Sequence, residues 1–267
     1  MVNKSILAMT LALTMIATTA LAEHPAANKY RSIIQSGNFV IEYGDAYLTK
    51  TIAAHKDMRM ERSFYKVKGG GGLVGIPLGI GGGSKKKDYP DTLYRDGKYY
   101  KFESKKKATM ATWNQLNDPC IDPAGGWNYA KYTLAVPEEF FALCNYDPFR
   151  YESGVMVAPR YVGSSKEMID KTEYDCDKYT VAMRSQTGAI MAETNYHYYY
   201  NDGELIFIKK NLKRNGTEYP MSDIMVKKIT SEVPVEMFNI PQGCKVYAVG
   251  VGDMNDLIEQ PLLVEEY

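Results

Sequence analysis

The chain has 267 residues, 45% of them hydrophobic, and its 32 basic residues balance 32 acidic ones. This length fits one large domain or two small ones, and the composition permits a real hydrophobic core. Because phosphate binding requires a basic surface, the balanced charge gives no reason to expect a nucleic-acid partner.

The first 22 residues predict an export signal. Lys4 supplies a positive charge, and the apolar run Ile6–Ala22 ends in the small-x-small pattern that a signal peptidase cuts after. The run is short for a bilayer span, which needs about 20 apolar residues. We therefore expect cleavage between Ala22 and Glu23 and a soluble mature chain in the periplasm or outside the cell. An uncleaved anchor is the alternative.

A short helix and several strands are expected in the first half of the mature chain. The helix is expected over Pro25–Gly37, where Tyr30, Ile33 and Ile34 share one face and Gly37 is a natural stop. Strand-like segments follow over Phe39–Tyr43, Tyr47–Ala54 and Met58–Val67, and Thr92–Phe102 contains a hairpin that turns at Asp96-Gly97.

The insertion 66–87 has an unusual composition, because two glycine runs enclose apolar residues and lysines flank both sides. A hairpin loop of this kind is expected to place its apolar tip in a membrane interface while the lysines meet anionic headgroups. The alternative is a glycine-loosened insertion without a partner. The expected membrane-contact residues are Leu73, Val74, Ile76, Leu78 and Ile80.

The middle of the chain changes to helical character, and we expect a helical insert over 124–145. Strand character returns afterwards, with turns at Asn201-Asp202-Gly203 and Asn215-Gly216. The expected later elements are strands over Tyr174–Met183, Ile190–Tyr200, Glu204–Leu212, Tyr219–Ile229 and Cys244–Val249, with a helical turn at Val235–Phe238.

These signals predict an α+β fold built on a large, curved antiparallel sheet. The sheet is expected to be an open half-barrel, with the N-terminal helix and the central helical insert as a lid over its concave face. The spacing of alternating strands and helices typical of a doubly wound sheet is absent. We expect one domain over 23–252 and a tail, 253–267, that forms one helical turn or two and ends loosely.

Four cysteines remain after the expected cleavage, and an even number in an exported chain predicts two disulfides with three pairings. We favour Cys176–Cys244, because both lie in strand-like contexts, and Cys120–Cys144 would then link the helical middle. Free buried thiols are the alternative. No C-x-x-C occurs, which argues against thiol-redox chemistry and ribbon-type zinc sites.

Three stretches resemble the periplasmic lipoprotein-carrier superfamily, the LolA/LolB-like proteins. The most similar is Met221–Tyr247, with a strand, a Val-Pro step, a short turn and a closing Phe-x-Ile-Pro-x-Gly. The segments Tyr30–Tyr43 and Tyr94–Tyr100 are also similar, so the resemblance covers most of the mature chain in layout. It implies a half-barrel with a helical lid over an apolar cavity and a lipid or acyl ligand, and it assigns no individual binding residue.

Two functions from different classes are consistent with these features. The leading one is an exported, non-enzymatic envelope protein that binds a lipid or an acyl group of a lipoprotein, driven by about 25 cal/mol per Å² of buried acyl surface. The alternative is a structural or protein-interaction module whose side chains fill its own core and whose exposed edge or glycine-rich loop docks a partner. A glycan hydrolase is a third hypothesis. The expected cavity wall comprises Phe39, Ile41, Tyr43, Tyr100, Phe102, Ile206 and Ile208.

Motifs for catalysis or metal binding are absent, including H-x-x-x-H, H-E-x-x-H and G-x-S-x-G. We therefore expect no enzymatic activity, no cofactor and no metal. Asp175 and Asp177 share a strand face, but two carboxylates fall short of the roughly six to eight oxygens that calcium takes. The run Tyr196–Tyr200 places three tyrosines on one face, suited to sugar stacking or a lipid cavity, with ordinary packing as the alternative.

Overall fold

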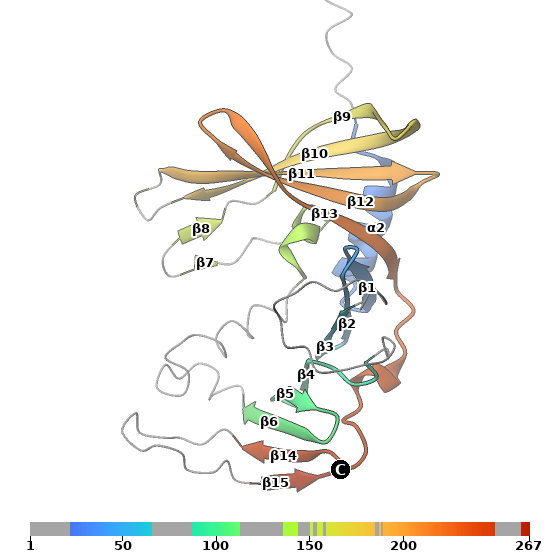
Figure 1. The fold of residues 1–267 in the computed structure, drawn as a ribbon, viewed down its shortest axis with the longest axis vertical. Helices are drawn as coiled ribbons and strands as arrows, with labels where there is room; N and C mark the ends of the chain where they lie inside the picture. The colour runs from blue at the N-terminus through green and yellow to red at the C-terminus, as the bar shows by residue number, and fades with distance from the viewer. Residues whose placement is uncertain are drawn as a thin grey trace, which may run out of the picture.

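A computed structural model describes residues 22–65, 87–112, 136–143, 150–151, 154–156, 159–184, 187, 189–248 and 263–267. Its described residues form a large, open sheet of fifteen strands (Figure 1). They include one α-helix, α2 (Pro25–Gln35), and two short 3-10 helices, η2 (Glu138–Leu143) and η3 (Val235–Phe238). None of the helices in the described ranges is long and apolar enough to cross a membrane.

The sheet is antiparallel except for one pair, and its strand order joins the two halves of the chain. Reading across the sheet, the order is β15-β14-β6-β5-β4-β3-β2-β1-β13-β12-β11-β10-β8-β7, with β9 also paired to β10. Only β14 and β6 run parallel among the described pairs. The first half of the chain contributes β1 (Phe39–Gly44), β2 (Leu48–His55), β3 (Met58–Tyr65), β4 (Thr92–Arg95), β5 (Lys98–Ser104) and β6 (Lys107–Thr112).

The second half of the chain supplies the longest strands, which lie at one end of the molecule in Figure 1, away from β4–β6. The strands of this half are β7 (Arg150–Tyr151), β8 (Gly154–Met156), β9 (Arg160–Ile169), β10 (Thr172–Arg184), β11 (Ile190–Asn201), β12 (Glu204–Arg214), β13 (Thr217–Thr230), β14 (Lys245–Ala248) and β15 (Leu263–Glu266).

The expected turn residues fix three of the hairpins. Asp96 and Gly97 join β4 to β5 with φ of +53° and +73°, so both central residues have the positive φ that a type I′ turn requires. Asp202-Gly203 and Asn215-Gly216 repeat this pattern before β12 and β13. The strand register in this part of the chain therefore follows directly from local sequence.

Helix α2 buries the face that its sequence predicts. Tyr30 and Ile34 are buried, as are Ala26 and Ala27, and Pro25 occupies the first turn, where a missing N–H costs nothing. Gly37 follows the helix with φ of +71°. The buried face packs onto the sheet and against η2.

Two hydrophobic clusters lie on opposite faces of β1 and β2. One, the α2 core, joins α2, η2 and the strands β1, β2 and β10–β13. The other, the η3 core, joins η3 and the strands β1–β6 and β14. Alternate residues of β1 point to each side, with Phe39 and Ile41 in the α2 core and Val40 in the η3 core.

Several expected elements differ from the structure. Of the predicted helical insert 124–145, the described residues 136–143 contain the 3-10 helix η2, and the rest lies outside the described residues. The expectation that the tail ends loosely is wrong, because 263–266 pair with β14 as β15. Strands β6 and β9 were not predicted, because their sequences are rich in Lys, Ser and Thr and lack an apolar run.

The predicted Cys176–Cys244 disulfide is wrong, because both thiols are free and buried. Cys176 lies in β10 and Cys244 directly before β14, and nine strands separate β10 from β14 in the sheet order. A disulfide needs Cα atoms within about 7 Å, little more than one strand spacing. Cys120 and Cys144 lie outside the described residues.

Thiol labelling should show that Cys176 and Cys244 are buried and not linked by a disulfide. Because Cys176 and Cys244 are fully buried, we expect iodoacetamide to modify neither residue in the native protein and both in denaturant without any reductant. Peptide mass mapping measures both states. Labelling in denaturant that appears only after reduction would contradict the free thiols.

Candidate functional site

The seven expected wall residues lie in three different places. Phe39, Ile41, Tyr43 and Ile208 come together in the α2 core. Tyr100 and Phe102 lie in the η3 core. Ile206 packs against a third cluster, formed by Cys176, Tyr199 and Phe207. These side chains therefore do not form one continuous wall.

A β-bulge in β12 separates Ile206 from Ile208. Tyr199 pairs with Phe207 but Tyr200 pairs with Leu205, so β12 has one extra residue, Ile206, at this point. A bulge breaks the alternation of side chains between the two faces. As a result Ile208 points into the α2 core while Ile206 packs with the third cluster.

Side chains of the two helices fill the α2 core where a ligand cavity was expected. Phe140 of η2 is 0% exposed, and its ring meets Tyr43 edge-on at 5.1 Å. Tyr198 donates its hydroxyl to the Glu139 carbonyl at 2.5 Å, which ties η2 to β11. Tyr30 and Ile34 of α2 complete the cluster. Phe39, Ile41, Tyr43 and Ile208 are therefore buried against other side chains of the described residues.

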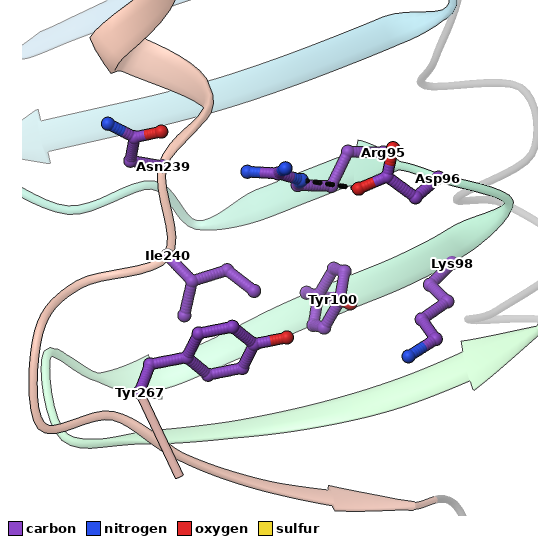
Figure 2. Close-up of a pocket in the computed structure, with 7 residues that line it drawn as sticks. All are labelled: Arg95, Asp96, Lys98, Tyr100, Asn239, Ile240 and Tyr267. Carbon is purple, nitrogen blue, oxygen red and sulfur yellow. Dashed lines mark hydrogen bonds and ion pairs between the residues drawn. The ribbon is translucent and has the colours of Figure 1, made fainter. Parts of the chain in front are cut away.

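A pocket of about 330 Å³ lies beside the η3 core at the turn between β4 and β5 (Figure 2). Arg95 bonds Asp96 through Nε at 2.9 Å and the Phe238 carbonyl through Nη1 at 3.1 Å. Tyr100 is the one expected wall residue that reaches this pocket. The lining residues are Arg95, Asp96, Lys98, Tyr100, Asn239, Ile240 and Tyr267. The lining combines two cationic side chains, the carboxylate of Asp96, an amide and apolar groups, and Arg95 is already paired with Asp96.

Three metal-ligand residue types meet on the outer face of β9–β11. Ligand atoms of Glu167, Cys176 and His197 lie within 4.8 Å of one another. Lys178 already pairs with Glu167 at 2.7 Å, and the Tyr199 hydroxyl donates to the other Glu167 oxygen at 2.7 Å. A metal ion would have to displace the Lys178 ammonium from Glu167. We therefore interpret the cluster as an ion pair between Lys178 and Glu167. No local sequence pattern indicates this cluster, because its three residues come from three different strands.

Burial affects the protonation of this cluster. It raises the pKa of Cys176 to about 12 and lowers the pKa of His197, so both groups are neutral near pH 7. Burial also acts to raise the pKa of Glu167, but the bonds from Lys178 and Tyr199 outweigh it and lower that pKa to about 2.

The Glu167 carboxylate should make stability depend on pH. Its pKa is lower in the folded chain than in the unfolded chain, so its contribution is complete above the unfolded value near 4.5 and disappears as the pH falls towards 2. We expect Glu167→Gln to lower the free energy of unfolding by at most about 3 kcal/mol at pH 7, because solvent screening reduces the effect, and by little near pH 2. Urea unfolding at several pH values measures this. An equal cost at both ends of the range would contradict it.

The residues before α2 form a polar cluster that the sequence did not predict. Glu23 pairs with Arg31 at 2.6 and 3.0 Å and accepts a hydrogen bond from the Tyr179 hydroxyl. The His24 ring stacks on Tyr200 at a centroid distance of 4.3 Å. Burial acts to raise the pKa of Glu23, but the bonds from Arg31 and Tyr179 outweigh it and lower that pKa.

The two aspartates of β10 both contact His24. Asp177 is 0% exposed and accepts hydrogen bonds from the His24 amide at 2.9 Å and from the Ser164 hydroxyl. Asp175 is half exposed and lies 3.7 Å from Nε2 of His24. Burial raises the pKa of Asp177 above its ordinary value, although both hydrogen bonds oppose this. The two carboxylates therefore hold the chain before α2 through His24.

Exposed apolar and aromatic side chains lie where β1 and β3 end and β2 begins, beside the middle of β13. We call this surface the tyrosine end and define it by Tyr47, Tyr65 and Met225. Tyr47 is 63% exposed and Tyr65 is 73% exposed. Tyr65 ends β3 opposite Leu48, Tyr47 directly precedes β2, and Met225 lies within β13 opposite Gly44, the last residue of β1.

The expected membrane-contact residues lie outside the described residues; they are Leu73, Val74, Ile76, Leu78 and Ile80. The insertion that contains them begins directly after Tyr65 in the sequence. Comparisons with protein-family models, with curated proteins and with solved structures find no match to this chain. A functional assignment therefore depends on the residues themselves.

Proposed function

We propose that this chain is an exported, non-enzymatic interaction module of the bacterial cell envelope, which binds a partner protein while its own side chains fill its core. The support for a filled core is the packing of α2 and η2 onto the sheet. In this core Ile41 of β1 and Phe140 of η2 are both fully buried. A lipid-binding protein of similar layout would need open apolar space at this place.

The tyrosine end is the docking surface that we propose, and its exposed aromatic rings are the observation that carries the proposal. Tyrosine and methionine are enriched in protein interfaces, because they bury much apolar area and tyrosine keeps a polar tip for hydrogen bonding. Tyr47 and Tyr65 each expose more than half of their surface, Leu48 beside Tyr47 pairs with Tyr65, and the apolar insertion 66–87 follows Tyr65 in the sequence.

Site-specific crosslinking in cells tests this surface. We expect a photoreactive phenylalanine analogue at position 47 or 65 to give a discrete crosslinked product with a partner protein. Tyr219 is a matched control, because it is 52% exposed but lies at the start of β13, away from the tyrosine end. The absence of a product at 47 and 65, or an equal product at 219, would exclude the tyrosine end as a docking surface.

Lipid carriage is the second candidate, and one observation favours it. A large, open antiparallel sheet with a helix packed on one face is the layout that the lipoprotein-carrier resemblance implies. A carrier purified without detergent should retain lipid detectable by mass spectrometry, and deletion of 69–83 should reduce its binding to anionic vesicles. An interaction module should retain no lipid, and the deletion should leave vesicle binding at zero.

A further inference from the structure

The buried carboxylate of Asp177 reaches chain atoms on both sides of the Ala22–Glu23 peptide bond. On one side, its Oδ2 accepts a hydrogen bond from the His24 amide at 2.9 Å. On the other side, its Oδ1 accepts from the Ser164 hydroxyl, whose Oγ also lies 3.3 Å from the Ala22 carbonyl oxygen. The nitrogen of Glu23 therefore lies between the His24 amide, which bonds Asp177 directly, and the Ala22 carbonyl oxygen, which is linked to Asp177 only through the Ser164 hydroxyl.

From this geometry we infer that Asp177 is the binding site for a new α-ammonium group on Glu23, created when the chain is cut after Ala22. Hydrolysis of the Ala22–Glu23 bond by a signal peptidase consumes one water and leaves a carboxylate on Ala22 and an ammonium on Glu23. The ammonium pairs with Asp177 and holds the chain start against β10. The inference rests on the cleavage that is part of the proposed function.

The surroundings suit an ammonium ion. Asp177 is fully buried, and among the described residues its carboxylate accepts hydrogen bonds from a hydroxyl and a backbone amide rather than from a lysine or arginine. A buried carboxylate gains most from a partner of opposite charge. In the same cluster the Tyr200 hydroxyl is buried and finds no hydrogen-bond acceptor or donor among the described residues, so it can accept a hydrogen bond from the ammonium.

The flanking contacts hold Glu23 in place for this pairing. The side chain of Glu23 is tied to Arg31 of α2 and Tyr179 of β10, and the His24 ring is stacked on Tyr200 of β11. These contacts involve three separate elements, so the position of the Glu23 nitrogen does not depend on the residues that precede it. A further charge near the site is the half-exposed carboxylate of Asp175, which lies 3.7 Å from Nε2 of His24.

The test compares two forms of the mature chain with defined N-termini, one starting at Glu23 and one carrying Gly-Ser before Glu23. In the wild-type sequence we expect the extended form to melt about 2–4 °C lower, because the ammonium is moved away from Asp177. In an Asp177→Asn background we expect the two forms to melt at the same temperature. Asp175→Asn is the matched control and should keep the full difference.

A second measurement needs no variant. We expect the α-amine of the Glu23 form to titrate well above its ordinary pKa of about 8, followed by NMR of the reductively ¹³C-methylated amine. An ordinary amine pKa, or a Gly-Ser extension that costs nothing in the wild-type sequence, would overturn the inference. Both forms are made by defined cleavage in vitro, so neither result depends on partner binding at the tyrosine end.

Discussion

Replacing Gly44 with alanine is expected to destabilise the protein by about 4 kcal/mol or more, which is enough to unfold many domains of this size. Gly44 has φ of +155°, and a Cβ at this position would lie 2.0 Å from the Leu48 carbonyl oxygen and 2.9 Å from Thr49 Cα. Both atoms belong to the backbone. The Leu48 carbonyl also accepts the Asp45 amide at 2.9 Å, so it cannot move away without opening the turn.

The damage should spread beyond the turn, because Gly44 pairs with Thr49 on one side and with Met225 on the other. Gly97→Ala is the matched control, since Gly97 has φ of +73° but nothing within 4 Å of the added Cβ. We expect this control to cost only about 1–2 kcal/mol, the strain of positive φ alone. Urea unfolding monitored by circular dichroism measures both, and equal costs would show that the close approach at Gly44 has no energetic effect.

Phe140→Ala should cost about 3–5 kcal/mol, because it removes a fully buried ring and leaves a cavity in the α2 core. The ring packs on Tyr43 at 5.1 Å and belongs to the 3-10 helix that covers the sheet. This prediction separates the two candidate functions. Truncating a residue that merely borders an open ligand cavity would cost much less, since the space around it would already be unfilled.

The control for Phe140→Ala is Tyr65→Ala, because Tyr65 is an aromatic residue that is 73% exposed. We expect Tyr65→Ala to change the free energy of unfolding by at most about 0.5 kcal/mol. The same urea titrations measure both variants. A cost below about 1 kcal/mol for Phe140→Ala would favour the lipid carrier over the self-filled module.

The local parts of the fold could be predicted from the sequence, and the non-local parts could not. Turn residues with positive φ at Asp96-Gly97 and Asn215-Gly216, together with alternating apolar residues, predict the hairpins because both signals act over a few residues. The pairing of β1 with β13 and of β6 with β14 leaves no such local signal. β9 was missed since a polar edge strand needs little apolar sequence.

The candidate site shows the same division. Period-two alternation correctly predicts that Phe39, Ile41 and Tyr43 share a face, and they do so in the α2 core. It does not predict which other element fills that face, and it fails at Ile206, where a bulge changes the direction of the side chain. The contact of Glu23 and His24 with β10 spans more than 150 residues of sequence, so no spacing or motif indicates it.

The two non-local pairings determine when this polypeptide can fold. Strand β1 acquires one of its two neighbours only when β13 has been made, and β6 must wait for β14. Chains of such high contact order fold slowly, and until then the early strands keep open edges that can associate with other chains. A nascent chain that stops before residue 217 lacks both partners, so productive folding has to begin after nearly the whole polypeptide has been synthesised.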